Sequence, residues 1–182
     1  MLKLNVKELR DRKPTKEELA SVSRLPIYIV LDNVLDTYNI GGIFRLAEAV
    51  TASEVILCGE SETPPSSRIH KAAVGTEEWV PWGYFPTAVE AVRRLKSANT
   101  RIIAVEQSEK SVPYMEIENC KLEIVNSAIA VVVGHETDGI SKNVLDMADI
   151  IAEIPMLGVN KSLNVIVSAA IVTYKILESF KK

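Results

Sequence analysis

The chain has 182 residues, is 47% hydrophobic and carries a formal net charge of −3. Its length suits one globular domain with enough apolar material for a core. It contains no run of 18 apolar residues and begins with a charged stretch, so we expect neither a membrane span nor a signal peptide. The acidic balance also excludes a large basic surface for nucleic acid over the whole chain.

Positive charge is nevertheless concentrated locally. Residues 1–17 hold six basic side chains against three acidic ones, and Arg68, His70 and Lys71 form a second cluster. Clusters of this size are more often solvated than ligand-bound, so they permit a polyanionic partner without requiring one. We treat residues 1–25 as a basic, partly helical extension packed on a single domain that spans residues 1–182.

Cysteine and histidine spacing gives no metal motif. Cys58 and Cys120 lie far apart, as is typical of reduced structural thiols in a cytoplasmic protein. His70 and His135 fall in different predicted loops, 65 residues apart. We therefore expect no metal site.

Strand and helix patterns alternate along the chain. Short runs rich in Val and Ile, without polar alternation, predict buried strands. A Thr at each start predicts helices from Thr15 and from Thr87, the second with a capping box to Glu90. The predicted strands are 26–31, 54–58, 101–106, 128–134 and 149–155, and further helices are 41–50 and 141–148. The order predicts an α/β fold with a mostly parallel sheet flanked by helices.

The segment after residue 162 predicts a long helix with two neighbouring apolar stripes. One runs from Leu163 through Val167 to Tyr174, and the other from Val165 through Val172 to Phe180. One stripe can pack on the sheet. The other needs a separate cover, either another part of the chain or, as we expect, a second copy in a homodimer.

Three polar loops follow predicted strands, where α/β sheets bind ligands. They are LDNVLDTYNIGGIFRLAEAV (31–50), GHETDGIS (134–141) and MLGVNKSLNV (156–165). None contains the phosphate loop GxxxxGK[ST] or the dinucleotide turn GxGxxG, so a Rossmann-type oxidoreductase is not indicated.

Single residues in these loops leave alternatives open. Arg45 suits a bidentate phosphate contact or a surface ion pair with Glu48 or Asp36. Asn39 suits a helix cap, and Glu136 an acid in a first helical turn. Ser162 or Asn160 suits a cap of the last helix.

Taken together, the loops resemble the SpoU (TrmH) family of RNA ribose 2′-O-methyltransferases, in the SPOUT superfamily. The segment NIGGIFRLAEA (39–49) resembles the first motif of the family, with Asn39, Gly41 and Arg45 in place. The second resembles VVVGHETDGIS (131–141), with Gly134, Glu136 and Gly139. The third resembles IPMLGVNKSLNVIVSAAI (154–171), and the resemblance covers about residues 26–177.

The resemblance implies a C-terminal trefoil knot that binds S-adenosyl-L-methionine, releases S-adenosylhomocysteine and dimerises through the last helix. The implied catalytic residues are Arg45, Asn39, Ser162, Asn164 and Glu136. The implied cofactor-binding residues are Val133, Gly134, His135, Glu136, Gly139, Ile154, Met156, Leu157, Ser162, Leu163 and Asn164. The residues expected to bind RNA are Arg45, Arg68, His70, Lys71, Arg10, Arg12 and Lys13.

The implied reaction is methyl transfer to a ribose 2′-hydroxyl of tRNA or rRNA in the cytoplasm, with tRNA slightly favoured. An arginine stays charged in proteins, so we expect Arg45 to bind a phosphate and stabilise the developing alkoxide. Two alternatives remain: a catalytically idle RNA-binding homodimer of the same fold, and a SPOUT enzyme that methylates a base.

Overall fold

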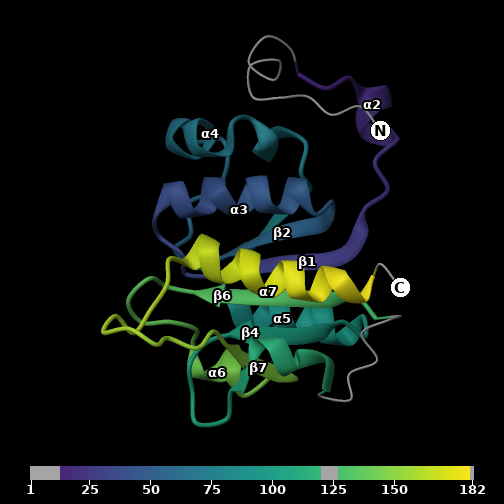
Figure 1. Cartoon of the computed structure of the whole chain (residues 1–182). Helices are drawn as coiled ribbons and strands as arrows, with labels where there is room; N and C mark the ends of the chain where they lie inside the picture. Colours follow the sequence, from purple (N-terminus) through teal and green to yellow (C-terminus); the bar gives the residue numbers. More distant parts are fainter. Residues whose placement is uncertain (1–12, 120–126, 181–182) are drawn as a thin grey trace.

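The computed structural model describes residues 13–119 and 127–180. Its centre is a seven-stranded sheet of order β3-β2-β1-β6-β4-β7-β5, with parallel pairing between neighbours. Helices lie on both faces (Figure 1). The strands are β1 (Leu25–Asp32), β2 (Ala52–Cys58), β3 (Trp82–Phe85), β4 (Arg101–Val105), β5 (Val112–Pro113), β6 (Ile129–Gly134) and β7 (Ile150–Glu153). The helices are α2 (Lys16–Ala20), α3 (Thr37–Ala49), α4 (Ser67–Ala73), α5 (Ala88–Ser97), α6 (Lys142–Leu145) and α7 (Val165–Ser179), with 3-10 turns η1 (Thr76–Glu78) and η2 (Tyr114–Asn119).

The predicted α/β class is confirmed, as are the five predicted strands, which correspond to β1, β2, β4, β6 and β7. Two strands were not predicted. β3 is an edge strand that presents Trp82 and Tyr84 outward, and β5 has two residues, so neither carries the buried Val and Ile pattern. The strand order does not test the trefoil knot, which stays a prediction.

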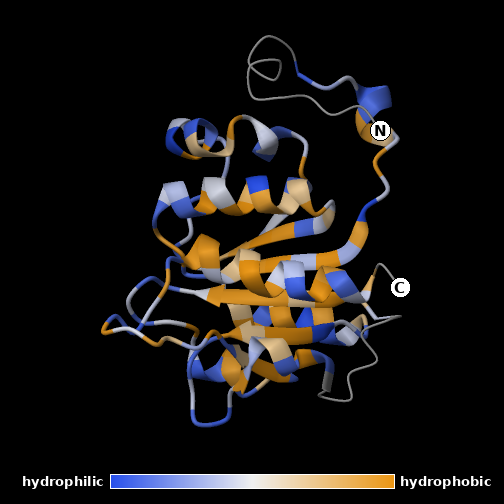
Figure 2. Cartoon of the chain, viewed as in Figure 1, coloured by the Kyte–Doolittle hydropathy of each residue, from blue (hydrophilic) through white to orange (hydrophobic). Residues whose placement is uncertain are grey.

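Burial on both faces explains the continuous apolar runs of the central strands. In β1, Ile29 and Leu31 face a cluster that includes α3 residues, whereas Val30 faces a cluster with α5 residues, and all three are fully buried. Full burial of such a side chain stabilises the fold by about 1.5–3 kcal/mol. Figure 2 shows the strands as the most hydrophobic part of the chain.

Helix α3 begins a turn earlier than the predicted 41–50. The Asp36 side chain accepts a hydrogen bond from the Tyr38 N–H and caps the helix, so Asn39 lies inside it and is not the cap. The two glycines are likewise helical. A Cβ at Gly41 would lie 2.5 Å from Ala72 of α4, and one at Gly42 would lie 2.3 Å from Ile166 of α7. The glycines let three helices pack closely.

Helix α4 was not predicted. Ser66 caps it and its hydroxyl accepts from the Ile69 N–H, so the helix begins at Ser67. Helix α6 is shorter than the predicted 141–148. The cap at Thr87 is confirmed, because its side chain accepts from the Glu90 N–H.

Helix α7 is capped by Asn164, whose side chain accepts from the Ile166 N–H, and not by Ser162 or Asn160. The stripe that contains Val172 packs on the sheet, whereas Val167 and Tyr174 of the other stripe remain 45% and 48% exposed. The predicted pair of apolar faces therefore exists, and one of them is only partly covered by the described residues.

The N-terminal part that is described makes few contacts with the domain. Helix α2 buries no residue, while Arg24 donates hydrogen bonds to the carbonyls of Ala52 and Trp79.

Burial raises the pKa of the Cys58 thiol to about 12, as expected of a structural cysteine, and Cys120 lies outside the described residues. Across residues 13–119 and 127–180, no helix has the length and apolarity that a membrane span requires.

Candidate functional site

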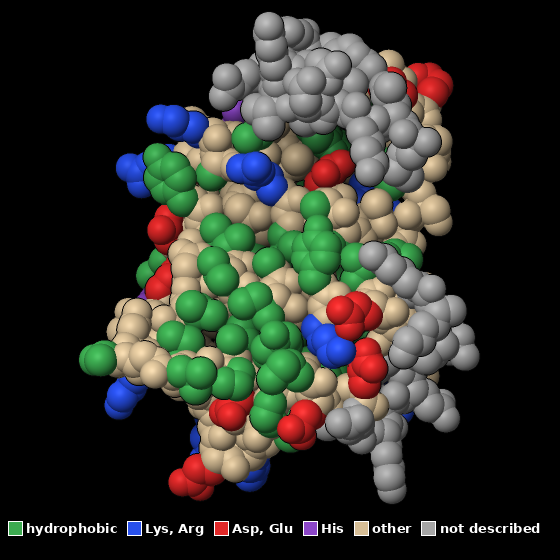
Figure 3. All heavy atoms as spheres, viewed as in Figure 1, with side chains coloured by type: hydrophobic (Ala, Val, Ile, Leu, Met, Phe, Trp, Pro, Cys, Tyr) green, Lys and Arg blue, Asp and Glu red, His purple; other side chains and the backbone are tan. Residues whose placement is uncertain are grey.

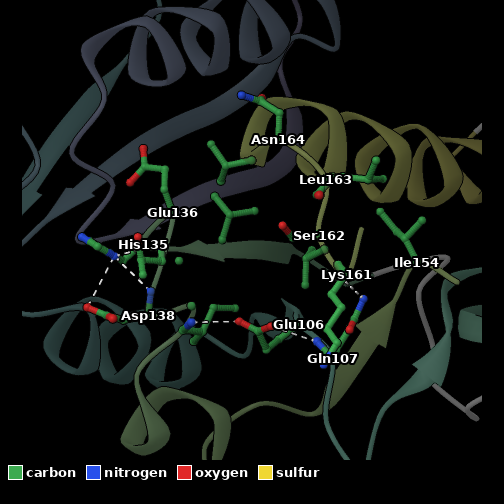
Figure 4. A pocket seen from close by; sticks show the side chains of 18 of the residues that line it. Glu106, Gln107, His135, Glu136, Asp138, Ile154, Lys161, Ser162, Leu163 and Asn164 are labelled. Atoms are coloured by element: carbon green, nitrogen blue, oxygen red, sulfur yellow. Dashed lines mark hydrogen bonds and ion pairs between the residues drawn. The ribbon is translucent and has the colours of Figure 1, made fainter. Parts of the chain in front are cut away.

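A cavity of about 760 Å³ lies where β4, β6 and β7 end (Figure 4). Its walls come from separate segments: 105–107 after β4, 133–140 after β6, Ile154 and Met156 after β7, 160–165 before and into α7, and Asp36 with Asn39 at the start of α3. The three polar loops singled out in the sequence thus meet at one edge of the sheet, as the carboxyl ends of parallel strands require.

A chain of side-chain hydrogen bonds joins the three motifs at this edge. The Asn39 Nδ2 donates to Glu136 Oε1 at 2.9 Å, and the Asn164 Nδ2 donates to Asn39 Oδ1 at 3.0 Å. Each of the three residues comes from a different motif. Asn39 is the link between the other two, because its amide both donates and accepts.

Glu136 also binds the backbone that precedes α3. Its two carboxylate oxygens accept from the N–H groups of Leu35 at 3.2 Å and Asp36 at 3.0 Å. Partial burial raises the pKa of Glu136, but the hydrogen bonds from Asn39, Asp36 and Leu35 outweigh it, so the pKa lies below its ordinary value. The carboxylate therefore stays ionised and holds the β6 loop against the start of α3.

The two glycines of the second motif are required by close packing. A Cβ at Gly134 would lie 2.2 Å from the carbonyl carbon of Gly139. Gly139 has a φ of +71°, and a Cβ there would lie 2.2 Å from Glu106 Oε2. Any larger residue would push the 134–139 loop away from the end of β4.

His135 holds the same loop from within. Its Nδ1 accepts from the N–H groups of Thr137 and Asp138, both at 3.1 Å. These bonds require an Nδ1 that is free to accept, and an Asp138 oxygen lies 3.5 Å from the same nitrogen. His135 therefore shapes the loop.

The third motif forms an exposed loop that is fixed near its end. The Asn160 side chain accepts from the Ser162 N–H, and the Gln107 Nε2 donates to the Lys161 carbonyl at 2.8 Å. Between β7 and this point the loop projects outward, with Leu157 98% exposed. Residues 160–165, next to α7, therefore form the part of this loop that is held in the cavity wall.

Most of the predicted cofactor-binding residues line this cavity. They are Val133, Gly134, His135, Glu136, Gly139, Ile154, Met156, Ser162, Leu163 and Asn164. Leu157 is not among the lining residues, and its exposure shows that its side chain does not reach the cavity. Of the predicted catalytic residues, Asn39, Glu136, Ser162 and Asn164 line the cavity, and Arg45 does not.

Arg45 is exposed on α3. It follows Gly41, which packs on α4, by four residues and Gly42, which packs on α7, by three, so helical spacing places it between the sides of α3 that face α4 and α7. In this position the guanidinium is available to a molecule that docks over α3 and α7, and it is not part of the cavity wall of its own chain.

The residues predicted to bind RNA are distributed over a different surface. Arg68 and Lys71 are exposed on α4, which packs against α3 and not against the cavity. His70, on the same helix, contacts the buried carboxylate of Glu77. Lys13 pairs with Glu78, and Arg10 and Arg12 lie outside the described residues.

The lining also includes residues that the sequence did not identify as part of the site, among them Asp36, Glu106, Gln107 and Lys161. Glu106 ends the predicted strand 101–106 and Gln107 follows it directly, so their position at a strand end was the available signal. With Glu136 and Asp138 the lining holds four carboxylates against one lysine. Such a lining favours a ligand that carries positive charge.

Comparison with known proteins places this geometry in a family. The family model described as the SpoU rRNA Methylase family matches residues 26–174. The 23S rRNA (guanosine-2′-O-)-methyltransferase of Neisseria meningitidis is 29% identical over 157 residues, which are 86% of this chain and 60% of that protein. The tRNA (guanosine(18)-2′-O)-methyltransferase of Escherichia coli is 31% identical over 150 residues, 81% of this chain and 61% of that protein.

A solved structure shares the fold. The AdoMet-bound rRNA methyltransferase from Sinorhizobium meliloti superposes with a TM-score of 0.76 at 26% identity, over 94% of this chain and 60% of that one. The chain thus spans about 60% of the length of these relatives. The matched region contains all three motifs that meet at the cavity, and the chain belongs to the SpoU rRNA Methylase family.

Proposed function

We propose that this chain is an S-adenosyl-L-methionine-dependent methyltransferase that modifies a ribose 2′-hydroxyl of RNA. The observation that carries the proposal is the Glu136–Asn39–Asn164 hydrogen-bond chain, which brings the three motifs together around one cavity. Relatives that act on guanosine 2′-oxygens and a neighbour with bound AdoMet support the same reaction.

The cavity residues fit the cofactor. The volume of about 760 Å³ is in the range of small-molecule sites, and the acidic lining suits a sulfonium cation. When bound, S-adenosyl-L-methionine supplies an activated methyl group. We assign its binding to the 133–139 loop, to Ile154 and Met156, and to the segment 162–164, with Val133, Ile154 and Leu163 as apolar walls.

Arg45 is the residue we propose for the hydroxyl that accepts the methyl group. A guanidinium stays protonated, so it stabilises the alkoxide that develops as the hydroxyl loses its proton to water. Its fork also suits an adjacent RNA phosphate. Ser162 and Asn164, which line the cavity near its α7 side, position the ribose and the loop.

A homodimer reconciles this role with the position of Arg45. Exposed apolar side chains gather over α7 and the loop before it (Figure 3), among them Leu163, Val167 and Tyr174. We propose that a second copy covers this face. Arg45 lies outside its own cavity, on the exposed part of α3 between α4 and α7, so we infer that it acts on the ribose bound at the cavity of the other copy.

Mixing two inactive variants tests this arrangement. Arg45→Ala and Gly139→Val disable different halves of a shared site, so dimers formed by subunit exchange contain one intact combination. We expect each variant alone to be inactive and the mixture to regain about a quarter of wild-type activity, because half of the dimers are mixed and each has one working site. A mixture as inactive as its components places Arg45 in its own cavity.

The RNA is proposed to lie across both copies, in the cytoplasm, and to contact Arg68, Lys71 and the N-terminal basic stretch. We favour tRNA over rRNA. An idle RNA-binding dimer would not need Asn39, Glu136 and Asn164 in one hydrogen-bonded chain, which favours an active enzyme. Base methylation is disfavoured by the relatives, whose names specify the 2′-oxygen.

The test is transfer of labelled methyl groups from S-adenosyl-L-methionine to total RNA of a strain that lacks the protein. We expect label in one RNA species, at a nucleotide whose 3′ phosphodiester bond resists alkaline cleavage because its 2′-oxygen is methylated. Label on a base supports the base methyltransferase, and RNA binding without label supports the idle dimer.

A further inference from the structure

Glu106 is a carboxylate of the cavity that none of the three motifs contains. Its Oε2 accepts from the Ile140 N–H at 3.0 Å, and its Oε1 accepts from the Gln107 N–H at 2.9 Å. An ionised carboxylate offers about four acceptor positions. Each oxygen of Glu106 therefore keeps capacity for another donor, and the residue lines the cavity.

The position of this side chain is fixed by both cofactor loops. Gly139 packs against Glu106 Oε2, where any Cβ would collide with it. The next residue, Gln107, holds the other loop through the Lys161 carbonyl. Figure 4 shows Glu106 between the His135–Asp138 loop and the Gln107–Lys161 contact. Its carboxylate is thus fixed in position where the two loops meet.

The other cavity carboxylates are differently engaged. Glu136 accepts three hydrogen bonds from the start of α3. Asp36 caps α3, and the Asp138 side chain is 81% exposed to solvent. Among the described lining residues, Glu106 is therefore the carboxylate best placed to accept hydrogen bonds from a ligand that lies between the loops.

We propose that Glu106 binds the ribose hydroxyls of the nucleoside cofactor. The inference rests on the proposed function, which supplies the ligand. A ribose presents two neighbouring O–H donors to a carboxylate, and an acid near the end of a parallel strand binds ribose in other α/β nucleotide sites.

The alternative partner in the same ligand is the sulfonium. Methyl transfer removes its positive charge, so a carboxylate against the sulfur stabilises the bound substrate more than the transition state and slows the reaction. The ribose keeps its hydroxyls throughout, so a carboxylate there contributes affinity without this cost.

Isothermal titration of the full chain tests the assignment with four probes: S-adenosyl-L-methionine, S-adenosylhomocysteine, its 2′-deoxy analogue and 5′-methylthioadenosine. Wild type, Glu106→Gln and the control Glu109→Gln are compared. Glu109 is an exposed carboxylate three residues further along that does not line this cavity. Binding of S-adenosyl-L-methionine to wild type checks the proposed function separately from the variants.

We expect Glu106→Gln to weaken every ribose-containing probe about tenfold, in line with hydrogen bonds to a charged acceptor. The deoxy analogue should bind wild type more weakly than S-adenosylhomocysteine, and this difference should shrink in Glu106→Gln. An unchanged difference means that Glu106 only holds the loops. Loss confined to S-adenosyl-L-methionine assigns it to the sulfonium, and loss that spares 5′-methylthioadenosine assigns it to the amino group. Each of these results overturns the proposal.

Discussion

The cavity and the α3–α4 surface contrast in how their functional side chains are held. Around the cavity, Asn39 joins Glu136 to Asn164 by hydrogen bonds, and the backbone of both loops is anchored at the end of β4. On the α3–α4 surface, Arg45, Arg68 and Lys71 are exposed. Under the proposed function, this difference means that the cofactor-binding part of the site is complete within one chain, whereas the RNA-binding part needs another molecule.

Removing Arg45 should impair only the RNA-binding part of the site, and we expect it to have the largest effect on activity. We expect Arg45→Ala to lower the rate of methyl transfer by about 10²–10³-fold, as does the loss of a group that stabilises an oxyanion. Affinity for S-adenosyl-L-methionine, measured by titration calorimetry, should not change. Arg45→Lys sharpens the result: near-full activity in that variant would contradict a bidentate role for the guanidinium.

Changing Gly134 should impair the cofactor-binding part of the site instead. Its Cβ would lie 2.2 Å from the Gly139 backbone, so Gly134→Ala should lower the free energy of unfolding by about 3 kcal/mol and abolish cofactor binding. Gly158→Ala is the matched control, because no atom lies within 4 Å of a Cβ there. Thermal denaturation compares them, and equal melting temperatures would refute the packing argument.

The two regions also differ in how well the sequence predicts them. Runs of Val and Ile located five buried strands, and strand ends located the loops, because hydrophobic burial acts locally along the chain. The resemblance to a known family supplied the roles of Asn39, Glu136 and Asn164. Their mutual hydrogen bonds join residues about a hundred positions apart, and no local pattern encodes such a contact.

Other features were misjudged for identifiable reasons. The helix was predicted to begin at Gly41 but begins at Thr37, so Gly41 and Gly42 lie inside α3, where they allow α4 and α7 to pack closely. Asp36 was considered as an ion-pair partner but caps α3. Glu106 was not singled out because it appears as the last residue of an apolar strand. Its hydrogen bond with the Ile140 N–H involves a loop that begins almost thirty residues later in the sequence.

A substitution on the exposed apolar face of α7 tests whether a second copy of the chain completes the RNA-binding part of the site, as proposed. Val167→Asp places a charge on the exposed stripe without touching the sheet side of the helix. We expect the dimer to dissociate about ten- to a hundredfold more readily, since burying an unpaired charge at an interface is costly. Sedimentation measures the effect. The exposed Leu157→Asp, which lies before α7, is the control, and dimerisation as strong as wild type in Val167→Asp would place the interface elsewhere.

Glu136 gives a smaller effect that depends on pH. Its pKa in the folded chain lies below the ordinary value of 4.5, so its contribution to stability is present above pH 4.5 and is lost as the pH falls through the folded-state pKa. We expect Glu136→Gln to unfold at a lower temperature than wild type near neutral pH, with a loss of about 1 kcal/mol. The gap in melting temperature should close in acid, and a gap that widens would contradict this linkage.

The most direct measurement is calorimetric titration of S-adenosyl-L-methionine into the wild-type chain and into Gly139→Val. We predict one cofactor per chain for wild type, and no measurable binding when a side chain occupies the space between Gly139 and Glu106. Absence of binding to the wild type, or equal affinity in both proteins, would contradict the assignment of the cavity as the cofactor site.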